Sequence, residues 1–326
     1  MNAPHPPLFG INLPWFDGAY GHDMAKNPRL ADWPVKFDAT RAYRPLIEAR
    51  DLGFSAVRVW LCENGEGIVV DDRDGMPVRA HDLLLENIRI VQECAKLVGL
   101  RVYWTLLDGN SWGREGDVLS HAILKGGDAC SRFADGVAAQ IAKVLDPEVT
   151  FAMEVVNEPE ALSADCVKPE LKGDAIGWEA MGKSIARIGD AIRAVRPGTS
   201  VTAGTLHMYL PQLLRAEPKV DAIDLHAYHI NGGLPSREDL AKYTGDDRFT
   251  NRSIPLIAGE CGLPDDAPSD SMSALTHFVF NADQYGYEAA FLWRLEKVLV
   301  DTSDKTRRTY TDVAKDLAKL LTPRRG

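Results

Sequence analysis

The sequence has no hydrophobic run long enough to span a membrane, and it has no excess of positive charge. Of its 326 residues, 37 are Lys or Arg and 47 are Asp or Glu, so the formal net charge is −10. A chain without a basic field cannot hold phosphates by charge, which argues against nucleic acid or an anionic membrane as a main partner. A neutral partner such as a sugar is compatible with this balance.

Cysteine is also scarce, with five residues scattered widely along the chain. The odd count and the absence of close spacing predict neither a disulfide framework nor a zinc site. No other cluster has metal-ligand spacing, so we expect no metal and no cofactor. The first seven residues contain neither a basic region nor an apolar run, which predicts a cytoplasmic protein, or a secreted one if an export signal has been trimmed.

Repeats of solenoid length and low-complexity linkers are absent as well, which predicts one domain over residues 1–326. Short apolar runs alternate with longer amphipathic stretches, as in the βα units of a parallel sheet. The predicted strands cover 8–14, 56–62, 101–108, 149–157, 200–206, 222–228, 255–260 and 289–295. The predicted helices cover 40–52, 81–98, 128–145, 174–195, 209–216, 236–243, 269–285 and 306–321.

Eight strands in alternation with eight helices predict a closed (β/α)8 TIM barrel, an α/β fold, rather than an open doubly wound sheet. The glycine-rich phosphate loop of a dinucleotide fold is also missing after the first strand. Loop insertions are expected near 63–81, 110–127 and 160–177. The first of them contains Asp74-Gly75 between apolar residues, which is typical of a hairpin.

Polar residues end several of the predicted strands, and in such a barrel these ends form the active site. The fourth strand ends in Asn157-Glu158-Pro159, and the seventh ends at Glu260. Glycoside hydrolysis requires two carboxyl groups across the bond that breaks, roughly 5 Å apart in a retaining enzyme. Strands two, six and eight add Arg58, His226, Tyr228 and Trp293 to the same rim.

The two glutamates need opposite protonation states. An acid must keep its proton near neutral pH, and we expect burial and the neighbouring nucleophile to raise its pKa. The nucleophile must stay ionised, which a cation such as Arg58 and a hydrogen bond from Tyr228 would favour. A structural ion pair between Arg58 and Glu154 is an equally good interpretation of that arginine.

These residues, in this order along the chain, resemble the clan-A glycoside hydrolases. The closest likeness is to family 5, the cellulase and β-mannanase family, and the run Val57-Arg58-Val59-Trp60 looks most like its mannanase branch. The resemblance spans the barrel from the second strand to the eighth. It implies a retaining β-glycoside hydrolase that acts on β-linked glucosides or mannosides by double displacement.

The resemblance also implies a role for each matching residue. Glu158 would be the acid/base and Glu260 the nucleophile, with Asn157 binding the 2-hydroxyl of the reacting sugar. The supporting residues would be Arg58 and Tyr228, which orient the nucleophile, His226 on the acid/base side, and Trp293 as the floor of the sugar subsite.

One departure from family 5 lies near the end of the third strand, where many members have a histidine. This chain has none there, and Asp108 or Asn110 is the candidate to take its place. Trp112 in the following loop is a second candidate for sugar contact. Two alternatives remain open: a β-xylosidase-like enzyme of family 39, and a carbohydrate-binding barrel without catalysis.

Overall fold

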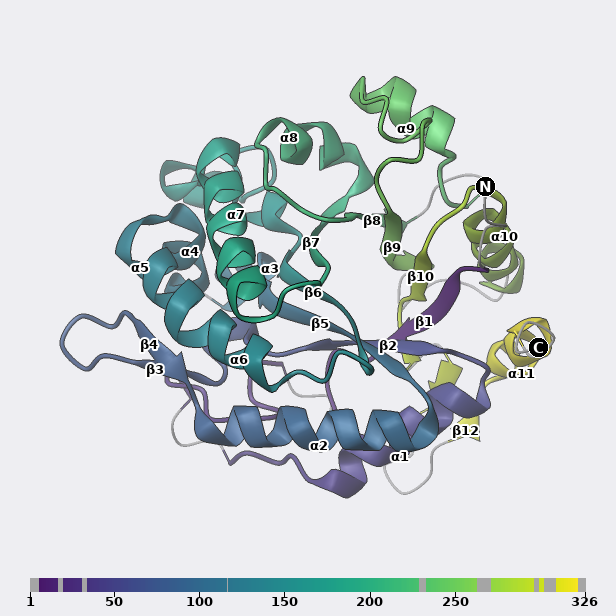
Figure 1. The fold of residues 1–326 in the computed structure, drawn as a ribbon, viewed down its shortest axis with the longest axis horizontal. Coiled ribbons are helices and arrows are strands. Elements are labelled where there is room, and N and C mark those ends of the chain that lie inside the picture. The colour runs from purple at the N-terminus through teal and green to yellow at the C-terminus, as the bar shows by residue number, and fades with distance from the viewer. Residues whose placement is uncertain are drawn as a thin grey trace.

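The computed structural model describes residues 6–16, 20–30, 34–115, 117–228, 233–262, 271–295, 299–301 and 309–321. Its centre is a closed ring of parallel strands with helices outside it (Figure 1). The order around the ring is β1-β10-β9-β8-β7-β6-β5-β2, so the predicted (β/α)8 barrel is confirmed. The strands are β1 (Leu8–Asn12), β2 (Ala56–Trp60), β5 (Arg101–Asp108), β6 (Thr150–Asn157), β7 (Val201–Leu206), β8 (Ile223–Tyr228), β9 (Leu256–Gly262) and β10 (Ala289–Leu292).

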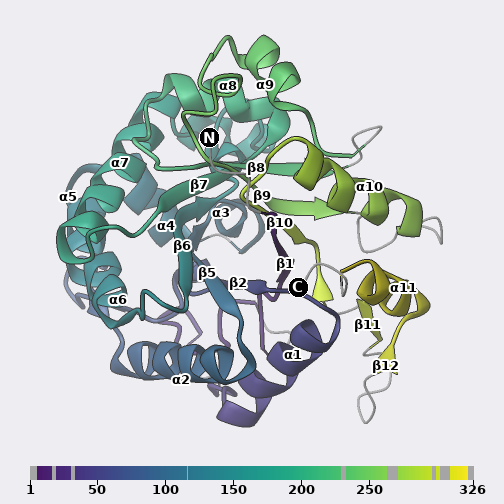
Figure 2. The same ribbon diagram turned by 45° about the vertical axis from the view of Figure 1, so that its right-hand side comes forward.

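The helices cover the outside of the ring, as Figures 1 and 2 show from two directions. The longer ones turn an apolar stripe to the strands; α2, for example, buries Leu84, Ile88, Val91 and Ala95 and ends at Gly99 in the left-handed conformation, φ 74°. The helices are α1 (Ala39–Asp51), α2 (Asp82–Val98), α3 (Asn110–Glu115), α4 (Val118–Lys125), α5 (Gly127–Arg132), α6 (Ala139–Val144), α7 (Trp178–Val195), α8 (Leu210–Arg215), α9 (Arg237–Thr244), α10 (Ser271–Gln284) and α11 (Asp312–Leu321).

The expected insertions contain short elements. After β2, a 3₁₀ turn (Glu63–Gly65) leads into the antiparallel hairpin of β3 (Ile68–Val70) and β4 (Pro77–Ala80), which projects from the body in Figure 1. The segment after β5 contains α3 and α4, two helices that are not among those predicted from the sequence. The segment after β6 contains two 3₁₀ turns, Pro159–Leu162 and Pro169–Asp174, and a third turn, His207–Tyr209, follows β7.

Three predicted helices differ from the structure, and the simplest case is 174–195, where α7 begins only at Trp178. The stretch 128–145 is divided by a π-helical segment, Phe133–Ala138, where Gly136 packs so closely on β4 that a Cβ would lie 2.1 Å from the Val78 carbonyl oxygen. The predicted helix 306–321 is wrong at its start, because β12 (Thr309–Tyr310) pairs with β11 (Val300–Asp301) and α11 begins only at Asp312. Residues 302–308, and the first two of the predicted helix 269–285, lie outside the described residues.

The interior of the barrel is divided into an apolar part and a polar part. The apolar part consists of small residues around two aromatic rings, Tyr103 and Phe291. Phe291 fills the space beside Gly10, where a Cβ would lie 2.2 Å from the ring. At the C-terminal ends of the strands, buried charged residues replace this packing, so the polar side chains of the barrel gather at one end.

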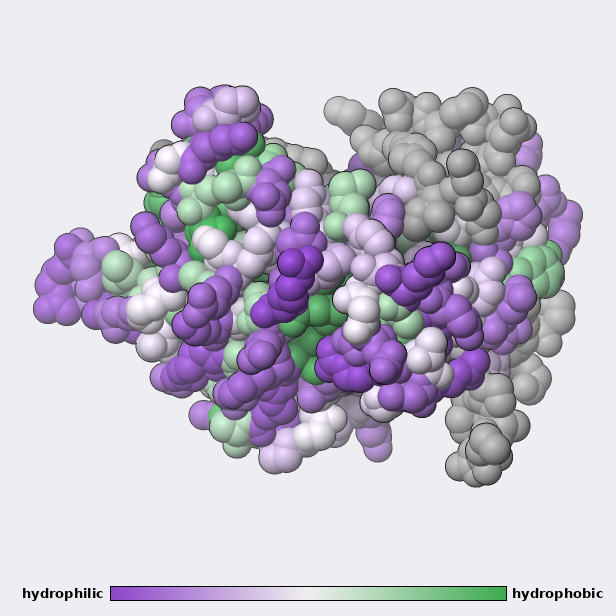
Figure 3. Space-filling model, turned by 90° about the horizontal axis from the view of Figure 1, so that it is seen from above, coloured by the Kyte–Doolittle hydropathy of each residue, from purple (hydrophilic) through white to green (hydrophobic). Residues whose placement is uncertain are grey.

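Figure 3 shows one face, on which hydrophilic residues surround a hydrophobic area near the centre. Within the described ranges, no helix combines the length and the apolar character that crossing a bilayer requires.

Candidate active site

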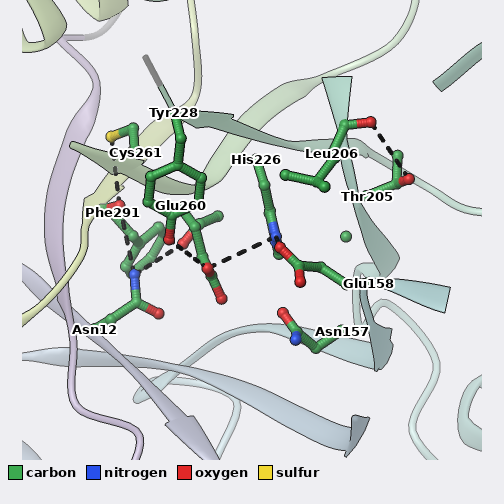
Figure 4. A network of polar contacts seen from close by, with 12 residues as sticks. Asn12, Asn157, Glu158, Thr205, Leu206, His226, Tyr228, Glu260, Cys261 and Phe291 are labelled. Carbon is green, nitrogen blue, oxygen red and sulfur yellow. Dashed lines mark hydrogen bonds and ion pairs between the residues drawn. The ribbon is translucent and has the colours of Figure 1, made fainter. Parts of the chain in front are cut away.

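The two predicted glutamates lie at neighbouring positions on the same rim. Glu158 directly follows β6, Glu260 lies in β9, and His226 of β8 is in register with Glu260. A carboxylate oxygen of Glu158, one of Glu260 and a ring nitrogen of His226 all lie within 4.8 Å of one another. Figure 4 shows the imidazole of His226 beside both carboxylates. This upper bound is close to the separation of about 5–5.5 Å in retaining glycosidases and well below the roughly 6.5–9.5 Å of inverting ones.

Glu260 is buried and is held by two strong donors. Arg58 Nη1 donates to Oε1 at 2.6 Å, and the Tyr228 hydroxyl donates to Oε2 at 2.5 Å. Burial and the charge of Glu260 raise the pKa of Tyr228, so this hydroxyl keeps its proton. Both carboxylate oxygens of Glu260 therefore accept a hydrogen bond, which fixes the orientation of this side chain.

Arg58 forms both ion pairs that the sequence suggests, one with the structural residue Glu154 and one with the candidate nucleophile Glu260. Its Nη2 lies 2.7 Å from Glu154 Oε2, its Nη1 reaches Glu260, and it also donates to Asn12 Oδ1 at 2.9 Å and Asn157 Oδ1 at 2.8 Å. Burial lowers the pKa of Arg58, but the charges of Glu154 and Glu260 outweigh burial and raise it. The guanidinium is thus a permanent cation that fixes the positions of four side chains.

Glu158 has a different set of partners. His226 Nδ1 donates to Oε1 at 3.0 Å, and Asn110 Nδ2 donates to Oε2 at 2.8 Å. Burial raises the pKa of Glu158, but the hydrogen bond and charge of His226 outweigh burial and lower it. The raised pKa predicted for Glu158 from the sequence is therefore wrong, because a cationic imidazole contacts the carboxylate.

The pKa of His226 is shifted in the opposite direction to that of Glu158. Burial lowers its pKa, but the charges of Glu260 and Glu158 outweigh burial and raise the pKa of His226 to about 10. The proton of the His226–Glu158 pair therefore resides on the imidazole at neutral pH. The pair can release that proton through Glu158 when a basic oxygen approaches.

Asp108 and Asn110 both lie where many family 5 members have a histidine, and they make different contacts. Asn110 contacts Glu158 directly, whereas Asp108 Oδ1 accepts from Asn157 Nδ2 at 2.8 Å and from the main-chain N–H of Asn110 at 3.1 Å. Burial raises the pKa of Asp108 to about 6, so this carboxylate is mostly ionised at neutral pH.

The two predicted tryptophans differ in their surroundings. Trp293, which follows β10, is half-buried, and its ring lies 6.1 Å from that of Trp60. Trp112 lies in α3, is only 8% exposed, and packs against His121 with ring centroids 4.5 Å apart. This packing leaves little of the Trp112 face for a sugar, so its role as a platform is not favoured.

Several residues of the site are missing from the predicted set. Asn12 ends β1, donates to the Gly259 carbonyl at 3.0 Å and orients Arg58, and the rule that polar residues end barrel strands could have found it. Tyr20 donates to Asp108 Oδ2 at 2.5 Å from the loop after β1, and nothing in its sequence context indicates this contact.

Two groups of side chains among the described residues have ligand atoms close enough to hold an ion: Glu158, His226 and Glu260, and below them Glu154, Asp224 and His226. Both groups contain His226, whose imidazole is cationic. Arg58 already pairs with a carboxylate of each group. The positive charges that balance these acids therefore come from the protein, and the arrangement suits acid–base chemistry.

No family model matches the chain. A mannan endo-1,4-beta-mannosidase from Mytilus edulis is 26% identical over 334 residues, which cover 90% of this chain and 84% of that protein. The solved structure of a beta-mannanase from the same mussel has a TM-score of 0.68 at 18% identity and covers 98% of this chain and 93% of its own. A GH5_18 structure from Streptomyces cattleya has a TM-score of 0.67 at 15% identity, over 99% of this chain and 81% of that one.

The structural matches establish the fold, and the sequence match covers nearly the whole barrel. The strand-end motifs lie in that barrel in the order found in the clan. In sequence and in fold, the chain is thus similar to the clan-A glycoside hydrolases, and within them it resembles family 5.

Proposed function

We propose that this chain hydrolyses β-1,4-linked mannosides within oligo- or polysaccharides, with Glu260 as the nucleophile and Glu158 as the acid/base. The mussel relative, named as an endo-acting mannosidase, and the mannanase-like run around Arg58 support mannose as the sugar. The observation that carries the proposal is the pair of close carboxylates with unlike partners: Arg58 and Tyr228 on Glu260, His226 and Asn110 on Glu158.

In the first step, a Glu260 oxygen attacks the anomeric carbon while the bond to the leaving oxygen breaks. Glu158 gives that oxygen a proton, which the His226–Glu158 pair supplies. The product is a glycosyl ester of Glu260 and a free alcohol. The ester neutralises Glu260, which removes one of the charges that raise the pKa of His226.

In the second step, a water molecule attacks the anomeric carbon from the side of Glu158. Glu158 takes a proton from this water as a base, and Glu260 leaves as a carboxylate that Arg58 and Tyr228 again stabilise. Two inversions give net retention at the anomeric carbon.

The substrate is tested with mannohexaose, cellohexaose and xylohexaose at equal concentration, followed by chromatography and by NMR of the first product anomer. We expect internal cleavage of mannohexaose with β-products and much slower cleavage of the other two. Preference for xylohexaose would favour the β-xylosidase-like alternative. Binding of the oligosaccharides without any cleavage would contradict catalysis.

The residue roles are tested by substitution. Glu158→Gln and Glu260→Gln should each lower kcat on mannohexaose by about 1,000-fold or more, whereas the exposed Glu170→Gln should leave it unchanged. With a dinitrophenyl substrate, azide should rescue Glu158→Ala and form a β-glycosyl azide, because this variant keeps the nucleophile. Formation of the β-glycosyl azide by Glu260→Ala, and not by Glu158→Ala, would reverse the two roles, because a variant without its nucleophile gives the α-azide.

A further inference from the structure

Asp108 lies at the end of β5, one side chain removed from the carboxylates that carry the chemistry. It is in register with Asn157 on β6, and its side chain is almost fully buried. Donors reach it from three residues: the side-chain amide of Asn157, the main chain and side chain of Asn110, and the hydroxyl of Tyr20. An ionised carboxylate only accepts, so each contact fixes the donating end of its partner.

The amide of Asn157 is held at both ends by groups of opposite kind. Its Oδ1 accepts from Arg58 Nη2 at 2.8 Å, and its Nδ2 donates to Asp108 Oδ1 at 2.8 Å. Rotating the amide by half a turn would set Nδ2 against a guanidinium and Oδ1 against a carboxylate, and both hydrogen bonds would be lost. The two charged groups thus permit one orientation, which leaves the second hydrogen of Nδ2 available to a ligand.

We propose that Asp108 is a positioning residue that aims this amide hydrogen of Asn157 at the 2-hydroxyl of the reacting sugar. The inference rests on the proposed function, in which Asn157 binds that hydroxyl. Tyr20 holds the other oxygen of Asp108, so the loop after β1 supports recognition of a sugar that it need not touch.

A second effect of Asp108 must be separated from the first. Asp108 also accepts the main-chain N–H of Asn110, whose side chain donates to Glu158. Its removal will therefore disturb the acid/base, whichever sugar is bound. A dinitrophenolate leaving group needs little protonation, so this substrate class suppresses the second effect.

The test compares two substrates: 2,4-dinitrophenyl β-mannobioside and its analogue that lacks the 2-hydroxyl on the reacting sugar. Deoxygenation at this carbon removes the hydroxyl that Asn157 would bind and leaves the rest of the reacting sugar unchanged. Asp108→Ala should lower kcat/KM about 50-fold on the hydroxylated substrate and about 5-fold on the deoxy substrate, a tenfold difference typical of one hydrogen bond.

Three further variants make the comparison specific. Asn157→Ala should show at least the same difference between the two substrates, and adding Asp108→Ala to it should not enlarge that difference. Ser111→Ala is the control, since Ser111 contacts Tyr20 and Asn64 but makes no hydrogen bond to Asn157. Because Tyr20 holds Asp108, Ser111→Ala should show a much smaller difference between the two substrates than Asp108→Ala.

Asp108→Asn covers the case in which the alanine variant does not fold. Its Oδ1 can still accept from Asn157, but without the charge that strengthens the bond, so we expect a smaller difference of about 3-fold. Equal losses on both substrates in the folded Asp108 variants would overturn the positioning role. Absence of hydrolysis by the unmodified enzyme would instead contradict the proposed function.

Discussion

His226 determines how protons are shared at the candidate site. Its Nδ1 lies 3.0 Å from Glu158 and 3.8 Å from Glu260, and no other cation than Arg58 contacts these carboxylates among the described residues. Because its pKa is raised to about 10 while that of Glu158 is lowered, the shared proton stays with the pair well above neutral pH. Such a pair titrates as a unit, and its upper pKa sets the pH at which the acid is lost.

His226→Ala should move the alkaline limb of the kcat/KM profile to lower pH. Without the imidazole, the proton can reside only on Glu158, which is a stronger acid than the imidazolium even when burial raises its pKa. We expect a downward shift of at least about one pH unit and a loss of activity of about 100-fold, measured on an aryl β-mannoside.

His207→Ala is the matched control for this profile. His207 follows the neighbouring strand β7, and burial lowers its pKa, but among the described residues it forms no hydrogen bond or ion pair with either glutamate. The alkaline limb of the kcat/KM profile of His207→Ala should coincide with that of the unmodified enzyme. An unshifted limb in His226→Ala would show that Glu158 holds its proton without the histidine.

At the scale of elements, the site depends on how closely β5 and β6 approach each other. The main-chain N–H of Gly109 donates to the Asn157 carbonyl at 2.8 Å, just where β5 ends. A Cβ on Gly109 would lie 2.2 Å from the Glu158 carbonyl oxygen and 3.1 Å from that of Asn157. Because Gly109 has no side chain, the main chain of Glu158 can lie in the position that the structure shows.

Gly109→Ala should displace the main chain of Glu158 and lower kcat about 100-fold, since a misplacement of about 1 Å can cost that much. The free energy of unfolding should fall by about 1–3 kcal/mol, as for other overpacked sites. Gly173→Ala is the control, because no atom lies within 4 Å of its Cβ position. Full activity of a folded Gly109→Ala variant would contradict this account.

At the scale of the whole molecule, buried acids fasten the segment after β1 to the barrel. Glu66 Oε1 accepts from the main-chain N–H groups of Met24 at 2.5 Å and Ala25 at 2.6 Å, and Glu63 Oε1 accepts from that of Gly21 at 3.0 Å. Burial, and then the charge of Asp23, raise the pKa of Glu66 to about 8. Burial likewise raises the pKa values of Glu160 to about 8 and Asp224 to about 7.

These shifts make the folded protein less stable as the pH rises. A carboxyl group whose pKa is raised on folding binds its proton more tightly in the folded state. Its contribution is present below the unfolded pKa of about 4.3 and is lost as the pH rises through the folded value. The free energy of unfolding should therefore decrease between about pH 5 and about pH 8.

Glu66→Gln isolates one part of this dependence. The amide oxygen can accept the same two main-chain hydrogen bonds, but it never ionises. Urea unfolding should give similar stabilities for both proteins near about pH 5 and a more stable variant by about 1–2 kcal/mol near about pH 8. A variant that is less stable at both pH values would show that the ionised carboxylate is the stabilising form.

Much of the barrel is local in origin and could be predicted. The ends of β5, 101 and 108, agree with the prediction, and the other barrel strands differ by at most three residues at either end, because a buried parallel strand is a short apolar run between turn residues. The helices α3 and α4 could not be predicted, since they are short and pack inside an insertion. The π-helical segment packs closely against β4 at Gly136, a contact between distant parts of the chain that no local pattern predicts.

The sequence by itself determined the fold class and the set of strand-end residues, because hydrophobic alternation and the position of a side chain on a strand are local properties. Only the tertiary structure decided how these residues share protons and orientations. The lowered pKa of Glu158, the single orientation of the Asn157 amide and the contact of Tyr20 with Asp108 all depend on groups far apart in the chain. Electrostatic interactions act through distance and burial, and closure of the barrel sets both.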